Sequence, residues 1–223
     1  MVSEAFLRVI GIWTFATFAP VLVEILFAGA LRRPGLGDLQ LSGSPDRVEA
    51  IVQGPPAQVE RLKRQLLVDY GFIALYWPAL VLLAIAIARR GGAGYNLVGL
   101  LAALAASATA LLDVVENIRT RGLLALTRPR DQVRRQPVVH LRETSRAKWA
   151  ASSATVALLS VFFLPGNGAL RLLGIAFLAV ALLGFVSAWK AKLIPAYLFA
   201  YLVLGAVLAA WFTVSPGGVL SRL

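Results

Sequence analysis

The chain contains no cysteine and a single histidine, His140. The absence of cysteine excludes disulfides, thiolate metal sites and a cysteine nucleophile. One imidazole excludes haem ligation by paired histidines and zinc sites built on histidine, and in a basic loop it is interpreted as a solvated side chain. No phosphate-binding glycine-rich loop and no G-x-S-x-G elbow occurs either. The sequence thus contains no established catalytic motif, predicts no cofactor and leaves open whether the protein is an enzyme.

Charged residues are also scarce, at 15% of the 223 residues, whereas 59% are hydrophobic. A soluble domain carries about 25% charged and about 45–50% apolar residues. The mean hydropathy is +0.77, and several apolar runs exceed the roughly 18 residues that indicate a membrane helix. The composition therefore predicts a protein whose solvent is the lipid bilayer.

The pattern of apolar runs predicts an all-α fold, a polytopic transmembrane bundle of six helices that forms one membrane domain over residues 1–223. Tight turns at Arg89–Gly94 and at Pro165–Gly168 separate neighbouring helices. Pro20 should kink the first of them. The six predicted helices span residues 9–31, 70–88, 95–117, 149–164, 169–189 and 193–214.

The positive charges predict the orientation of this bundle. The first, third and fifth loops contain six, nine and two Lys or Arg residues, and the rest of the chain contains five. Because Lys and Arg accumulate in cytoplasmic loops, loops 32–69 and 118–148 should be cytoplasmic and both termini outside. The net charge of +11 has the same explanation, so nucleic-acid binding is not predicted. The Ala/Leu/Arg-rich composition is typical of bacteria, which indicates the inner membrane.

The first loop carries signals for short cytoplasmic helices. Ser44-Pro45-Asp46 combines an N-cap residue, a proline at the first helical position and an acid in the first turn. This helix should end near Gln53, before Gly54. Residues 57–68 then have apolar residues at 3–4 spacing, which predicts an amphipathic helix on the membrane surface or continuous with the second membrane helix.

The third loop is strongly basic. The simplest interpretation is an anchor on anionic lipid headgroups, at about 1 kcal/mol per charge near the surface. A docking site for an acidic protein partner is the alternative, and a homo-oligomer remains open. The residues expected at the lipid surface are Arg128, Arg130, Arg134 and Arg135.

Acidic residues at membrane depth are the candidates for chemistry. Glu24 lies seven residues from the predicted end of its helix, about 10 Å inside, and an ionisable group there is a functional-site candidate. Asp113, Glu116 and Asn117 share one helical face. Asp69 and Tyr76 share a face of the preceding helix, which the short turn makes an antiparallel neighbour. These six residues should form a polar cluster near the cytoplasmic interface.

Carboxylates and an amide at one place suit a hard cation, a protonatable relay or polar headgroups. If the cluster binds a metal, its ligands would be Glu24, Asp113 and Glu116. The structural alternative is that Asp113 and Glu116 pair with Arg119, Arg121 or arginines of the first loop and fix the helix ends. Tyr76 would then serve as a hydrogen-bond partner for Glu24.

The motifs D-x-x-F-I-x-x-Y (residues 69–76) and D-x-x-E-N (residues 113–117) resemble a group of uncharacterised bacterial membrane proteins. The S-P-D-R-V-E-A run at 44–50 is similar too. The resemblance covers roughly residues 40–120 and implies no activity.

Three functions follow as hypotheses. The first is binding or transport of a cation, a proton or an amphiphile through the acidic pocket on the cytoplasmic side. The second is a membrane-embedded enzyme that processes lipids, with carboxylates holding a metal. The third is a non-catalytic accessory or scaffold subunit of a membrane complex.

Overall fold

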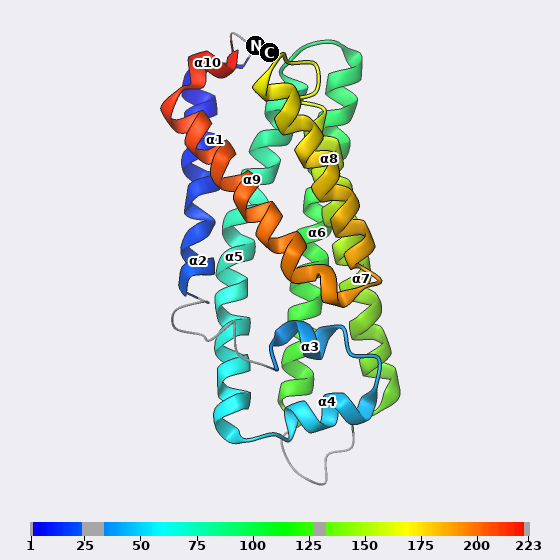
Figure 1. Cartoon of the computed structure of the whole chain (residues 1–223). Coiled ribbons are helices and arrows are strands. Elements are labelled where there is room, and N and C mark those ends of the chain that lie inside the picture. Colours follow the sequence, from blue (N-terminus) through cyan, green and yellow to red (C-terminus); the bar gives the residue numbers. More distant parts are fainter. Residues whose placement is uncertain (1, 24–33, 127–132, 221–223) are drawn as a thin grey trace. The chain divides into compact units, whose positions relative to one another are not determined.

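The computed structural model is all-helical in the residues it describes, which are 2–23, 34–126 and 133–220 (Figure 1). The candidate site residue Glu24 and the lipid-surface candidates Arg128 and Arg130 lie outside these ranges, so their predicted roles stay predictions. The helices are α1 (Glu4–Ala16), α2 (Phe18–Val23), α3 (Leu36–Gln40), α4 (Pro45–Val52), α5 (Pro56–Ala88), α6 (Ala93–Leu124), α7 (Arg135–Ser160), α8 (Ala169–Ser187), the 3-10 turn η2 (Ala191–Leu193), α9 (Ile194–Val214) and α10 (Pro216–Leu220).

Five helical segments are long and apolar enough to cross a membrane: Glu4–Val23, Pro56–Ala88, Ala93–Leu124, Ala169–Ser187 and Ile194–Val214. This agrees with an integral membrane protein. α7 is not among the five, because its N-terminal half is polar and charged. Six membrane spans, and termini that share one side, therefore remain predictions that depend on α7.

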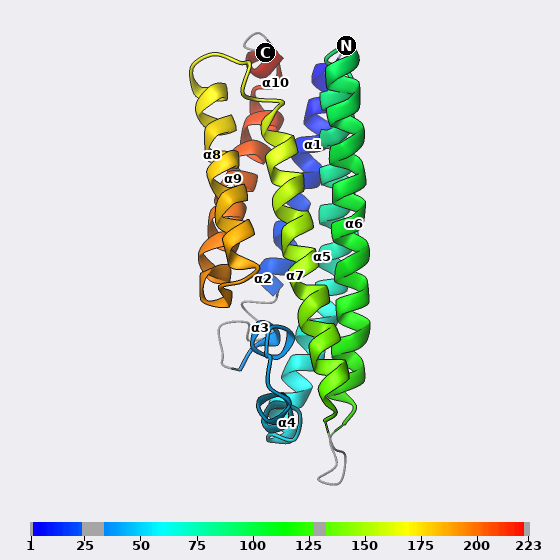
Figure 2. The same cartoon turned by 90° about the vertical axis from the view of Figure 1, so that its right-hand side faces the viewer.

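The helices form two compact units, to both of which α5, α6 and α7 contribute. The first unit comprises Met1–Phe18, Ala74–Thr109 and Trp149–Leu223. In it α9 lies beside α1 and beside α8 (Figure 2). Gly11 allows the close approach of α1 to α9, since a Cβ at Gly11 would lie 2.6 Å from the Thr213 hydroxyl. Phenylalanine rings fill its centre, where Phe163 stacks on Phe177 with their centroids 5.4 Å apart.

A break divides the first apolar segment. α1 ends at Ala16 and α2 begins at Phe18, with Thr17 between them. Pro20 lies four residues after Ala16, and a proline ring clashes with the carbonyl four positions earlier and lacks the N–H that would bond it. The predicted kink therefore corresponds to an end of helix at Ala16. The Thr17 hydroxyl bonds the Thr14 carbonyl at 2.6 Å.

The second unit comprises Ala19–Ile73 and Ala110–Lys148. Its apolar core joins α3 and α4 to the facing parts of α5, α6 and α7 through buried aliphatic side chains such as Leu39, Val52, Leu62 and Leu141. Here the capping prediction is confirmed: α4 begins at Pro45, and the Ser44 hydroxyl accepts a hydrogen bond from the Arg47 amide at 3.4 Å.

The predicted amphipathic segment at 57–68 is helical, and it is continuous with the next predicted helix as the single helix α5. The predicted loop at 118–148 is also mostly helical, because α6 continues to Leu124 and α7 begins at Arg135. At 1.5 Å per residue, the 32 residues of α6 measure about 48 Å. That exceeds the hydrocarbon core of about 30 Å, so a part of α6 extends beyond it.

Candidate functional site

On each of the helices α5, α6 and α7, a single charged residue separates a charged part of the helix from an uncharged part. In α6 the first twenty residues, 93–112, carry no charge, and Asp113 follows them. In α5 Asp69 is the last charged residue before the uncharged stretch 70–88. In α7 Lys148 is the last charged residue before the apolar C-terminal half. A stretch of about 20 uncharged residues is the length that crosses the hydrocarbon core, so Asp69 and Asp113 each lie at the end of a segment of membrane-spanning length.

Asp69 and Asn117 join α5 to α6. The Asn117 amide donates a hydrogen bond to Asp69 Oδ2 at 2.7 Å. Asp69 is half-buried, and Asn117 has no exposed surface. The carbonyl oxygen of the same amide, Asn117 Oδ1, is buried and has no hydrogen-bond partner among the described residues. A buried acceptor without a donor costs about 1–3 kcal/mol, so this oxygen is a position where a proton donor is missing.

Lys148 joins α7 to α6. Its ammonium donates to Asp113 Oδ1 at 3.0 Å and also bonds the Glu116 carboxylate. Asp113 is 6% exposed, Lys148 8%, and Glu116 is fully buried. The i, i+3 spacing of the two acids lets one ammonium reach both. Such a pair is held inside the protein because either charge alone would be costly there.

Further polar groups enclose Glu116. The Ser145 hydroxyl bonds the Glu116 carboxylate and also lies 3.2 Å from the Gln40 carbonyl. The Gln40 amide reaches the Thr120 hydroxyl at 3.5 Å. Ser145 and Thr120 have no exposed surface. The carboxylate cluster, by which we mean Asp69, Asp113, Glu116, Asn117, Ser145 and Lys148, thus draws on α5, α6 and α7, and α3 closes one side of it.

The charges of the cluster do not balance. Its three carboxylates and one ammonium carry a formal charge of −2 when all four groups are ionised. Burial by itself lowers the pKa of the Lys148 ammonium, but the carboxylates of Asp113, Glu116 and Asp69 outweigh that effect and hold the pKa above its ordinary value. Lys148 therefore stays charged at neutral pH. A carboxylate buried without a cation gains protons instead of staying ionised, so the surplus negative charge calls for a proton or another cation.

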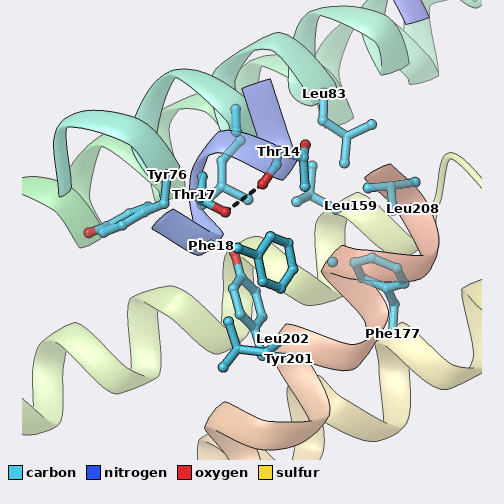
Figure 3. A pocket seen from close by; sticks show the side chains of 13 residues that line it. Thr14, Thr17, Phe18, Tyr76, Leu83, Leu159, Phe177, Tyr201, Leu202 and Leu208 are labelled. Carbon is cyan, nitrogen blue, oxygen red and sulfur yellow. Dashed lines mark hydrogen bonds between the residues drawn. The ribbon is translucent and has the colours of Figure 1, made fainter. Parts of the chain in front are cut away.

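Four of the six predicted site residues come together: Asp69, Asp113, Glu116 and Asn117 lie in the second unit. Tyr76 belongs to the first unit and lines a pocket there (Figure 3). Glu24 is outside the described residues. The predicted pairing with Arg119 is not found, since that guanidinium bonds the His140 carbonyl at 2.7 Å and the Thr144 hydroxyl. His140, Arg134 and Arg135 are exposed.

Sequence reasoning missed Lys148, Ser145 and Gln40. The first two carry a detectable signal, because buried positions recur along α7 at Val138, Leu141, Ser145 and Lys148 with the 3–4 spacing of one helical face. The abundance of arginine in this segment hid that pattern. Gln40 carries no comparable signal, because its place depends on the packing of α3.

The part of the chain that the structure describes contains no group of three His, Cys, Asp or Glu side chains that could hold a metal ion. Of the suggested ligands, Asp113 and Glu116 share the ammonium of Lys148, and a divalent cation would have to displace it. In comparisons with protein-family models, with curated proteins and with solved structures, the chain matched none of them.

Proposed function

We propose that this chain is an integral membrane protein that carries protons, and that the carboxylate cluster is where it takes up and releases them. The observation that carries the proposal is that two carboxylates, Asp113 and Glu116, share the Lys148 ammonium, while a third, Asp69, is bonded only by the neutral Asn117 amide. A proton is the smallest cation that reduces the surplus, from −2 to −1, and it needs no set of metal ligands.

The groups in and beside the cluster would allow a bound proton to move between its carboxyl groups. Lys148 keeps its charge, so the proton shifts between the carboxyl groups of Asp69 and Glu116. Asp69 is half-buried and its carboxyl adjoins the Asn117 amide, whereas Glu116 has no exposed surface. Arg61 is the nearest preceding cation on the same face of α5, and it donates to the Pro34 carbonyl at 2.8 Å. Asp69 is therefore the entry point in this proposal and Glu116 the inner acceptor.

The test is proton flux in liposomes that contain the purified chain and a pH-sensitive dye, driven by a potassium diffusion potential. Wild-type liposomes should acidify faster than protein-free ones, and Glu116→Gln and Asp69→Asn should each remove that excess. Glu143→Gln is the matched control, because Glu143 is exposed and bonds Arg146 at 3.2 Å on the surface of α7. It should keep the wild-type rate.

Three outcomes contradict the proposal. Wild-type liposomes that behave like protein-free ones exclude proton carriage. A wild-type rate in Glu116→Gln shows that the cluster only holds the helices together. A flux that follows Na⁺ instead of H⁺ assigns the site to a metal cation.

A further inference from the structure

The side-chain amide of Asn117 is hydrogen-bonded at its nitrogen only. The nitrogen donates to Asp69 Oδ2 at 2.7 Å. The oxygen, Oδ1, is buried and accepts no hydrogen bond from the residues that the structure describes. Both atoms are bonded to the same carbon, so the oxygen belongs to a group that already faces Asp69. Because a buried acceptor normally has a donor, a donor is expected beside the Asp69 carboxyl.

Asp69 differs from the other two carboxylates of the cluster. Asp113 and Glu116 share the Lys148 ammonium, whereas Asp69 is bonded by the neutral Asn117 amide. A carboxylate that is withdrawn from water without a cation gains a proton more readily than one that is paired. Of the three acids, Asp69 is therefore the one whose surroundings favour a bound proton.

The charged neighbours of Asp69 carry a net negative charge. The groups that act on it electrostatically from α6 and α7 are Asp113, Lys148 and Glu116. On α5 the positions one turn away, 65–66 and 72–73, are uncharged. α3 contributes the uncharged Gln40 to the cluster. A proton on Asp69 thus reduces the repulsion among these groups and displaces none of the bonds of Lys148.

A carboxylic acid can form two hydrogen bonds with a primary amide. Its carbonyl oxygen accepts one from the amide nitrogen, and its hydroxyl donates the other to the amide oxygen. A carboxylate forms the first bond only, because it has no hydrogen to donate. Protonation of Asp69 thus preserves the bond from Asn117 Nδ2 and provides Oδ1 with the donor it lacks.

We infer that the proton taken up by the carboxylate cluster is bound between Asp69 and Asn117, as a carboxylic acid whose hydroxyl donates to Asn117 Oδ1. This site rests on the proposed proton carriage, and it locates the proton at the point of entry. When the proton arrives, an O–H bond forms at Asp69 and the ion pairs of Lys148 stay intact. Asn117 is a positioning residue, because it acts on the proton through Asp69.

Nuclear magnetic resonance tests this site on the unmodified protein in nanodiscs. The chain contains three asparagines, Asn96, Asn117 and Asn167, so asparagine labelled with ¹³C at Cγ gives three side-chain signals. Asn96 and Asn167 are exposed, and their replacement by glutamine assigns their two signals. The third signal belongs to Asn117.

The Asn117 signal should follow the protonation of Asp69. The pH is lowered through the range in which the infrared carboxylic acid band that Asp69→Asn removes appears. Over this range the Asn117 Cγ signal should shift to higher frequency, as a carbonyl does when it gains a hydrogen bond, while the signals of Asn96 and Asn167 stay in place. Asp69→Asn should abolish the shift, and addition of Na⁺ at constant pH should not reproduce it.

The frequency of the acid band gives a second readout. Hydrogen bonds lower the stretching frequency of a carboxylic acid C=O. The band should therefore move to higher frequency in Asn117→Leu, whose side chain neither donates nor accepts. Asn96→Leu is the matched control on the same helix, and it should leave the band at its wild-type frequency.

Three results would overturn this site. An Asn117 signal that stays in place while the acid band titrates assigns the proton to another carboxyl group, although proton carriage itself would stand. An acid band of unchanged frequency in Asn117→Leu shows that the acid is not bonded to this amide. A shift of the Asn117 signal on addition of Na⁺, with loss of the acid band, assigns the position to a metal cation. Failure of the proposed function is distinguishable, because wild-type liposomes would then behave like protein-free ones.

Discussion

The Asn117 amide donates to the Asp69 carboxylate at 2.7 Å, and this bond joins α6 to α5 across 48 positions of sequence. The oxygen of the same amide, Oδ1, is buried and has no hydrogen-bond partner in the described part of the chain. One side chain therefore both fixes two helices and leaves an acceptor open beside a carboxyl group. A proton bound in this part of the cluster would have a polar group to receive it.

Replacing Asn117 by alanine should lower the free energy of unfolding by about 1–3 kcal/mol, because Asp69 loses the donor that stabilises its buried oxygen. Thermal unfolding in detergent, followed by circular dichroism, measures the change. Asn96→Ala is the matched control on the same helix, since Asn96 is exposed, and it should shift the transition by less than a third as much. Equal shifts in the two variants would show that the bond to Asp69 contributes nothing.

Lys148→Met should be the more destabilising change. Removal of one partner of a buried ion pair costs about 3–5 kcal/mol, since the remaining carboxylates lose their counter-ion. A second substitution, Glu116→Gln in the Lys148→Met background, should recover part of the loss because it removes one of those charges. The control is Lys63→Met, which breaks the exposed pair with Glu60 at 2.7 Å and should cost less than about 1 kcal/mol. An additive double variant would argue against coupling between Lys148 and Glu116.

Ser44→Ala should destabilise α4 locally, by about 1 kcal/mol, because the Arg47 amide loses its cap. Hydrogen exchange of the α4 amides in detergent should become faster, while the amides of α9 keep their rates. Ser44→Asp restores a capping oxygen and should restore slow exchange. Unchanged exchange in Ser44→Ala would mean that the packing of Val48 and Val52 alone holds this helix.

The topology depends on α7. If this helix crosses the membrane, there are six spans, and both termini lie outside while residues near Gln132 are cytoplasmic, as the charge distribution predicts. If it does not, the five candidate spans place the termini on opposite sides. Reporter fusions at Leu223 and near Gln132 distinguish the two. A cytoplasmic reporter at Leu223 would exclude the predicted arrangement.

Local signals in the sequence predicted local structure well. The Ser44 cap and the helical segment at 57–68 were predictable because capping and 3–4 spacing depend on neighbouring residues. The shared face of Asp113, Glu116 and Asn117, and its proximity to Asp69, also followed from helical geometry and a short turn. The identity of their cationic partner, Lys148, did not follow from the sequence, because it depends on how α7 packs against α6. Arg119 is closer in sequence, but its guanidinium is occupied by the His140 carbonyl.

Composition misled in one place. Nine basic residues between 118 and 148 suggested a solvated loop, yet Leu141, Ser145 and Lys148 are buried on one face of α7. The remaining arginines of this helix project from other faces, so an average over the segment conceals the face that packs. Tyr76 shares a face of α5 with Asp69, but it lies two turns farther along and lines a pocket of the first unit.

Infrared spectroscopy of the purified protein tests the central claim most directly, because a neutral carboxylic acid has a C=O stretching band that a carboxylate lacks. At neutral pH the wild-type protein should show this band, and it should weaken as the pH is raised. Asp69→Asn or Glu116→Gln should reduce it, and Glu143→Gln should leave it unchanged. A neutral-pH spectrum without a carboxylic acid band, or a band that persists unchanged in both Asp69→Asn and Glu116→Gln, would contradict proton binding at the carboxylate cluster.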